Sequence, residues 1–327
     1  MGTIEMTFGS AIRQALREEM SRDPDVFLLG EDIGKYGGAF KVTMALIDEF
    51  GPERVIDTPI SEAAIVGVAL GAALMGKRPV AEIMYMDFLQ LAMEQLVTQA
   101  ARARFLSGGK LEVPMTVRTQ YSLGRTYGPQ HTQFFPSWFF QAPGLYVALP
   151  STPADAKGLL KSAIRGRNPV LFIECGALYT TSGPVPEEEY LTPFGKASVK
   201  RSGNHVTLVA FSRVVLEALK AAEELSEEGI NVEVIDPLTI QPLDKETIVN
   251  SVRKTHRLVL ASDDFAIGGV GSAVVSAILE DVFYELEAPI KIVGSPPFPA
   301  PSNYVLEQQY MVNKEKIKEA IRDVVSA

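Results

Sequence analysis

Residues 54–74 read RVIDTPISEAAIVGVALGAAL, a short apolar run that turns at once into a long one. RVID (54–57) has the composition of a strand, and TPIS separates it from a helix predicted over 61–76. A strand followed directly by a helix is the repeating unit of a parallel sheet. The stretch therefore predicts an α/β fold.

The same alternation extends over the first half of the chain. It predicts helices over 87–106 and 153–165, and strands over 26–29, 79–84, 113–118, 145–149 and 169–174. Near-continuous apolar strands separated by helices indicate a parallel sheet that is covered on both faces.

The segment TTSGPVPEEEYLTPFG (180–195) interrupts this rhythm with prolines, glycines and an acidic run, as a domain linker does. The alternation then restarts, with strands predicted over 205–211, 231–236, 257–262 and 290–294 and helices over 213–228, 244–254, 270–286 and 314–325. We expect two α/β domains, 1–185 and 195–327, joined by a linker at 186–194.

Composition narrows the class of protein. The chain has 46% apolar and 22% charged residues, as folded globular proteins do, and its net charge of −9 argues against nucleic-acid or anionic-membrane partners. A single cysteine, Cys175, fits a reducing compartment. No targeting pattern is visible, and the apolar run 63–76 is shorter than the roughly 20 residues of a membrane span. We expect a cytoplasmic protein.

Glu62 is the first candidate functional residue. It follows the strand at 54–57, at the carboxyl edge where open α/β sheets bind ligands. The alternative is a first-turn acid on the surface side that complements the helix dipole. No G-x-G-x-x-G fingerprint follows a strand and no phosphate-binding P-loop is present, so neither common nucleotide motif supports a role for this edge.

His131 is the second candidate. It is one of only three histidines and lies in TYGPQHTQFFPSW (126–138), which is too polar and too rich in proline to form a regular element. Such a segment is either a catalytic loop that presents an acid/base group or a surface loop with an incidental histidine.

The helix predicted over 61–76 is apolar all round. Gly67 and Gly71 are four residues apart and share a face, so another helix could approach closely there. The helix is therefore either a buried core helix or part of a subunit interface, and it can be both.

Several motifs, taken together, closely resemble one family. They are VFLLGEDIGKYGGAFKVT (26–43), RVIDTPISEAAIVGVALGAAL (54–74), RPVAEIMYMDF (78–88), GPQHTQ (128–133), PSTPADAKGLLKSAIRGRNPV (150–170) and EVIDPLTIQPLD (233–244). The family is the beta subunit of the thiamine-diphosphate-dependent decarboxylase component of 2-oxo acid dehydrogenase complexes, which includes the pyruvate, branched-chain and acetoin enzymes. The resemblance implies a pyrimidine-binding thiamine-diphosphate domain followed by a transketolase-C-terminal-like domain.

The resemblance also implies roles for individual residues. Glu62 matches the carboxylate that hydrogen-bonds the aminopyrimidine ring and so activates the cofactor. His131 matches the acid/base that faces the substrate and assists acyl transfer to a lipoyl arm. The remaining cofactor contacts match Phe88, which packs on the ring, and Ile60, Met84 and Glu31.

Partners follow from the same resemblance. The Gly-Asp-Gly motif and later Asn through which thiamine enzymes bind Mg²⁺ are absent from this sequence, and in this family they lie on an alpha subunit. The chain is thus expected to act in a heterotetramer of two alpha and two beta chains, and to form a homodimer when alone. The expected acyl acceptor is the lipoyl domain of a dihydrolipoyl acyltransferase core.

The sequence departs from the family pattern in several places, two of which concern the expected site. TQYSLGRTY (119–127) replaces a glycine-rich run, and Gly166 stands where an Asp often binds a monovalent cation such as potassium. The implied cation site would then consist of Met115, Ala163, Ile164, Gly166 and Asn168.

Two other functions are compatible with the residues. One is a non-catalytic assembly subunit of such a complex, and the other is a transketolase-like thiamine enzyme. The choice between pyruvate and branched-chain 2-oxo acids stays open, because much of the acyl pocket is expected to come from the alpha chain.

Overall fold

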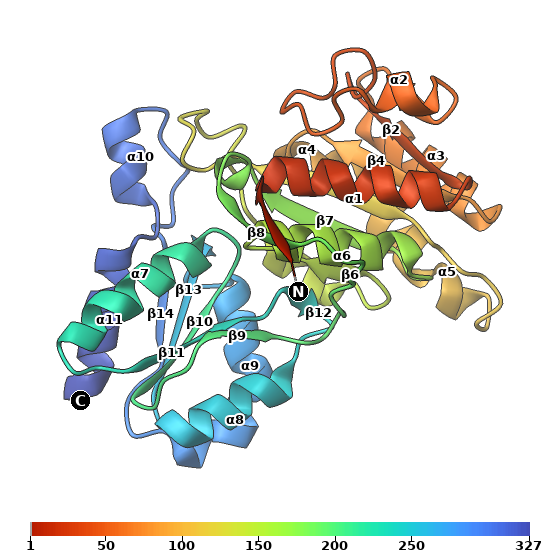
Figure 1. The fold of residues 1–327 in the computed structure, drawn as a ribbon. Helices are drawn as coiled ribbons and strands as arrows, with labels where there is room; N and C mark the ends of the chain where they lie inside the picture. Colours follow the sequence, from red (N-terminus) through yellow and green to blue (C-terminus); the bar gives the residue numbers. More distant parts are fainter. Residues whose placement is uncertain (1) are drawn as a thin grey trace.

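The structure, a computed structural model, describes residues 2–327. The chain forms two α/β units, one around a seven-stranded sheet and one around a five-stranded sheet (Figure 1). The prediction of an α/β fold is confirmed. None of the helices within residues 2–327 is both long and apolar enough to cross a lipid bilayer.

The larger sheet is parallel except at one edge, where β12 runs antiparallel to β6. Its strands, in spatial order, are β12 (Thr239–Gln241), β6 (Tyr146–Ala148), β7 (Val170–Cys175), β5 (Thr116–Tyr121), β4 (Arg78–Ile83), β2 (Val26–Gly30) and β3 (Val55–Asp57). Every residue of β5 and β7 is buried, as expected for parallel strands covered on both faces.

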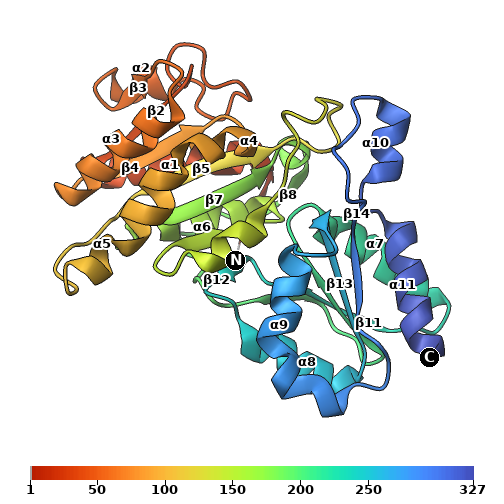
Figure 2. The same ribbon diagram turned by 180° about the vertical axis from the view of Figure 1, so that it is seen from behind.

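Helices cover both faces of this sheet (Figures 1 and 2). They are α1 (Phe8–Arg22), α2 (Leu46–Phe50), α3 (Glu62–Leu74), α4 (Met86–Leu89), α5 (Ala101–Leu106) and α6 (Pro153–Arg165). The helix predicted over 87–106 is one helical path in which a π-helical stretch, Glu94–Ala100, precedes α5. Helix α6 begins at a proline, and Thr152 caps it by accepting a hydrogen bond from the Asp155 N–H at 3.2 Å.

The second unit repeats the plan on a smaller scale. Its sheet has the order β14 (Lys291–Ser295), β13 (Leu258–Phe265), β10 (Val206–Ala210), β11 (Val232–Asp236) and β9 (Ser198–Arg201), with β9 antiparallel to its neighbour. Its helices are α7 (Val214–Glu227), α8 (Lys245–Thr255), α9 (Val270–Val282), α10 (Tyr304–Tyr310) and α11 (Lys314–Ser326).

The structure corrects three sequence expectations. Part of the segment 180–195 is not a linker, because β8 (Ser182–Pro186) pairs antiparallel with β1 (Thr3–Thr7). Strand β12 lies beyond the expected linker yet completes the first sheet. The strand expected over 113–118 begins at Thr116 instead, after Pro114, which has no N–H to give to a ladder.

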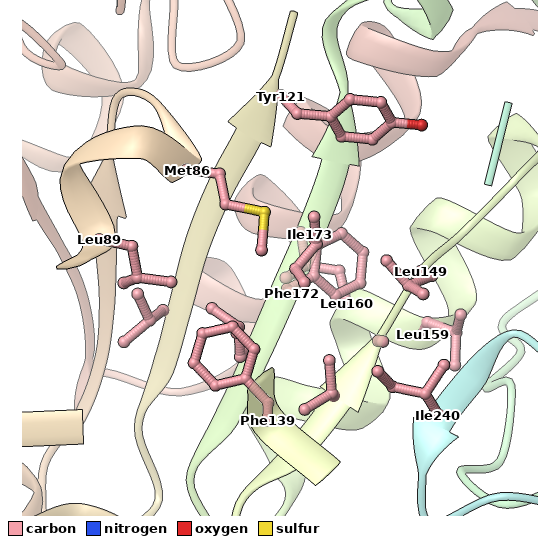
Figure 3. Packing of buried hydrophobic residues seen from close by; sticks show 14 of the residues in the cluster. Met86, Leu89, Tyr121, Phe139, Leu149, Leu159, Leu160, Phe172, Ile173 and Ile240 are labelled. Carbon is pink, nitrogen blue, oxygen red and sulfur yellow. The ribbon is translucent and has the colours of Figure 1, made fainter. Parts of the chain in front are cut away.

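One cluster of buried apolar residues joins the two units. Figure 3 shows part of it, with Leu159 and Leu149 of the first unit close to Ile240 of β12. The same cluster includes Leu260 from the second sheet. The edge of the first sheet therefore packs against the unit that follows it.

Candidate active site

Four neighbouring parallel strands end at one edge of the larger sheet, and each is followed by a residue singled out from the sequence. The strands are β5, β4, β2 and β3, in that spatial order. The residues that follow them are, in the same order, His131, Phe88, Glu31 and Glu62. The fold brings to one edge residues that are up to a hundred positions apart in the sequence.

His131 lies between two aromatic rings. Its ring centroid is 4.7 Å from that of Tyr85 and 5.4 Å from that of Phe88, with interplanar angles of 84° and 87°. The imidazole is half-buried. Two edge-on aromatic contacts restrict the ring, so His131 is not a loosely held surface histidine.

Asp87 is a site residue that sequence reasoning missed. Its Oδ1 accepts the backbone N–H of Gln133 at 3.2 Å, which ties α4 to the loop that carries His131. Burial raises the pKa of Asp87, while the Gln133 hydrogen bonds and the nearby His131 oppose that rise. Within residues 2–327, its Oδ2 is buried without a hydrogen-bond partner. The available signal was a single acid in the otherwise apolar run MYMDFL (84–89).

Glu31 and Glu62 form a pair of neighbouring acids. Glu62 is only 6% exposed, which corrects the expectation of a surface-side acid at the start of its helix. Burial raises the pKa of Glu31, and the charges of Glu62, Asp32 and Glu82 raise it further. Glu31 Oε1 is buried and has no hydrogen-bond partner in the described part of the chain. A carboxyl in such surroundings keeps its proton to a higher pH than an ordinary glutamate.

The other predicted cofactor contacts lie at the same edge. Ile60 follows β3 and is 81% exposed, and Met84 follows β4, where its carbonyl accepts from Gln120 Nε2 at 3.3 Å. The pyrimidine end of thiamine diphosphate fits three groups at this edge. They are the exposed side chain of Ile60, the aromatic ring of Phe88 and the buried, unpartnered Oε1 of Glu31. These groups suit a flat ring with hydrogen-bond donors.

A buried ion-pair network stabilises the sheet just below this edge. Arg118 Nη1 lies 2.7 Å from Glu82 Oε2, and Arg118 Nε lies 2.8 Å from Glu174 Oε1. The hydroxyl of Tyr179 donates to Glu174 Oε2 at 2.7 Å. These contacts hold β4, β5 and β7 side by side. They therefore help to fix the ends of β4 and β5, which Met84 and the loop of His131 follow.

The carbonyls of the predicted monovalent-cation site are already engaged. Arg78 Nη1 donates to the carbonyls of Ile164 and Gly166, at 2.8 Å each. The carbonyls of Ala163 and Met115 accept backbone N–H groups at 3.1 Å and 2.9 Å.

Asn168, the remaining member of that set, lines a cavity of about 940 Å³ whose wall also carries Arg102, Arg104 and Arg167. The positively charged guanidinium of Arg78 lies at two of the carbonyl groups, and Gly166 has no carboxylate side chain. With this positive charge at two of the carbonyls and no carboxylate to balance a second cation, the residues present do not fit a potassium ion.

Comparisons with known proteins identify the two domains of the chain. The transketolase pyrimidine-binding domain matches residues 4–181, and the transketolase C-terminal domain matches residues 195–317. A solved structure described as a split-gene transketolase, inactive β4 tetramer, has a TM-score of 0.80 at 24% identity, covering 98% of this chain and 99% of that one. At this identity the similarity establishes the fold alone.

Relatives with higher identity are beta subunits. The 2-oxoisovalerate dehydrogenase subunit beta of Bacillus subtilis (strain 168) is 43% identical over 321 residues, which cover 98% of each chain. The mitochondrial pyruvate dehydrogenase E1 component subunit beta of Dictyostelium discoideum is 42% identical over 326 residues, which cover 98% of this chain and 92% of the relative. The chain therefore belongs to the beta subunits of 2-oxo acid dehydrogenases, with a transketolase pyrimidine-binding domain followed by a transketolase C-terminal domain.

Proposed function

We propose that this chain contributes one half of an active site that oxidatively decarboxylates a 2-oxo acid and transfers the acyl group to lipoamide. The observation that carries the proposal is the gathering of an acid pair, an aromatic ring and a histidine at one sheet edge, in a chain of this family. Thiamine diphosphate, when bound, supplies the nucleophilic carbon and the electron sink that decarboxylation needs.

The protein residues have separate tasks in this proposal. Glu62 accepts a hydrogen bond from the pyrimidine ring, and Glu31 lies beside it with a pKa that burial and the neighbouring carboxylates raise. Phe88 and Ile60 hold the ring by apolar contact. The His131 imidazole, held between Tyr85 and Phe88, gives and takes a proton at the substrate.

An alpha chain is the proposed source of the groups that bind Mg²⁺ and the diphosphate. Helix α3 supports pairing with another chain, because it carries an exposed apolar stripe. The stripe consists of Ala64, Val68, Gly71, Leu74 and Met75. A Cβ added at Gly71 would meet no atom within 4 Å, so the surface there is open to close approach. We propose a heterotetramer with two alpha chains, and a homodimer of the isolated chain through the same face.

We also propose domain limits at 1–185 and 195–327, with 186–194 as the connection and with β12 of the second range completing the first sheet. A dihydrolipoyl acyltransferase with its lipoyl domain is the proposed acyl acceptor. A cytosolic location completes the proposal and is supported by Cys175, a buried thiol whose pKa burial raises to about 11.

Acylation of an isolated lipoyl domain tests this function. The chain would be assembled with its alpha chain and supplied with Mg²⁺, thiamine diphosphate and either pyruvate or 2-oxoisovalerate. We expect acylation with at least one of the two acids and at least a roughly hundredfold slower rate with Glu62→Gln. Glu53→Gln, an exposed acid at the other end of β3, serves as the control and should keep full activity. Acylation that is equal in both variants would contradict the proposal and favour an assembly role.

A further inference from the structure

Glu307 connects the second unit to the loop that leads into His131. It lies on α10 and is fully buried. Its Oε1 accepts the backbone N–H of Gly124 at 3.1 Å, and its Oε2 accepts the backbone N–H of Thr126 at 2.9 Å. Figures 1 and 2 both show α10, in blue, beside the yellow loop of the first unit. One carboxylate thus holds two backbone groups from a segment more than 180 positions away.

The loop needs such support because its backbone is unusual. Gly124 and Thr126 have φ values of 91° and 60°, in the left-handed region, which disfavours threonine. A Cβ on Gly124 would lie 3.0 Å from Met311 Cε, and one on Gly128 would lie 3.2 Å from Ser302 Cβ. The segment around α10 therefore packs against the loop on both sides of the hydrogen bonds.

The same loop fixes the start of the histidine segment. The carbonyl of Gly128 accepts the backbone N–H of His131 at 3.3 Å and the hydroxyl of Thr132 at 2.8 Å. Glu307 is thus connected to His131 by a hydrogen bond to Thr126, by the backbone from Thr126 to Gly128, and by the hydrogen bond between Gly128 and the His131 N–H.

We propose that Glu307 is a positioning residue for catalysis, which fixes the His131 loop from the second unit. The proposal rests on the proposed function, in which His131 exchanges protons with the substrate. Glu307 touches neither substrate nor cofactor in this account. It acts through the backbone of residues 124–128. The second unit would then set the geometry of a catalytic group that the first unit carries.

The two acceptor oxygens of Glu307 allow a substitution that removes one hydrogen bond and keeps the shape of the side chain. Its two carboxylate oxygens each accept one of the two N–H groups, and burial leaves no water to replace them. In Glu307→Gln one of the two atoms becomes an NH₂ group, which opposes the N–H it faces and leaves that donor unpaired. The side chain keeps almost the same volume, so packing around α10 changes little.

The test compares Glu307→Gln with wild-type chain and with Gln309→Ala, an exposed residue on the same helix. Each is assembled with the alpha chain. For Glu307→Gln we expect kcat for acylation of the lipoyl domain to fall about 10- to 100-fold, with KM for the 2-oxo acid changed less than about twofold. Affinity for Mg²⁺–thiamine diphosphate should stay unchanged. Amide hydrogen exchange over 122–133 should become faster. Gln309→Ala should match wild type throughout.

Two results would overturn the proposal. One is unchanged kcat with unchanged exchange over 122–133. The other is a fall in cofactor affinity and in rate that is fully explained by a lower Tm of the variant. That result would indicate a purely structural role for Glu307. If Glu307→Gln does not fold, Glu307→Asp replaces it, since a shorter carboxylate can reach one N–H and should give an intermediate kcat. If wild type itself does not acylate lipoamide, the proposed function fails. The exchange experiment then decides on its own whether Glu307 holds the loop.

Discussion

The imidazole of His131 stands edge-on to the phenyl ring of Phe88, with ring centroids 5.4 Å apart and an interplanar angle of 87°. The two side chains come from segments that follow neighbouring strands: Phe88 from α4 after β4, and His131 from the loop after β5. The contact therefore joins the residue proposed to hold the cofactor ring to the residue proposed to serve the substrate.

His131→Asn should separate these two tasks. Asparagine keeps a polar side chain in the loop but cannot exchange protons near neutral pH. We expect acyl transfer to lipoamide to fall by about 10²–10⁴-fold, with thiamine diphosphate affinity unchanged. Calorimetric titration of the cofactor and a lipoyl acylation assay measure the two effects. A variant that loses cofactor affinity but transfers acyl groups normally would show that the histidine serves the cofactor side.

Glu31→Gln should change the pH dependence of stability. Burial and the neighbouring charges raise the folded-state pKa of Glu31 above its unfolded value, so ionisation of Glu31 penalises the folded state. The penalty is absent below the unfolded pKa and grows as the pH rises through the folded pKa. We expect Glu31→Gln to have the Tm of wild type near pH 4 and a higher Tm at pH 8. A constant difference across this range would mean that Glu31 is not perturbed.

Arg118→Met should destabilise the fold strongly. The substitution leaves Glu82 and Glu174 without their partner, and Glu174 is fully buried. We expect the free energy of unfolding to fall by roughly 3–5 kcal/mol. Urea unfolding measures it, and Arg167→Met, which removes an exposed pair with Glu112, should cost less than about 1 kcal/mol. Equal effects of the two substitutions would show that the buried network contributes no more than a surface pair.

Potassium should not stabilise the chain. Arg78 already donates to two carbonyls of the site at which the family resemblance implies a monovalent cation. We expect the Tm in potassium chloride to equal the Tm in choline chloride at the same ionic strength. A rise of several degrees that is specific to potassium would show that a cation binds beside Arg78 or displaces it.

The spacing of apolar residues predicted those helices and strands that carry an apolar run of their own. Strands β2, β4 and β7 and helices α3 and α6 lie within a few residues of their predicted bounds, because apolar runs and turn residues mark them directly. The carboxyl-edge position of Glu62 followed from the same reasoning. The family resemblance, not the pattern, implied the roles of Phe88 and His131.

The features that were missed depend on distant partners. Strand β8 exists through its pairing with β1, and β12 through its pairing with β6, and neither has an apolar run of its own. Glu307 has no visible motif, since its contacts to Gly124 and Thr126 arise only when the two units pack together. Asp87 was missed for the same reason, because its hydrogen-bond partner Gln133 lies in a distant loop.

This sheet edge is proposed to be half of a catalytic centre, which an alpha chain must complete. Release of CO₂ from a 2-oxo acid, measured with Mg²⁺–thiamine diphosphate while the alpha chain is titrated in, tests it most directly. We expect no release by the chain alone, activity that saturates at one alpha chain per chain, and little activity with Glu62→Gln at any ratio. Robust release before any alpha chain is added, or full activity with Glu62→Gln, would contradict it.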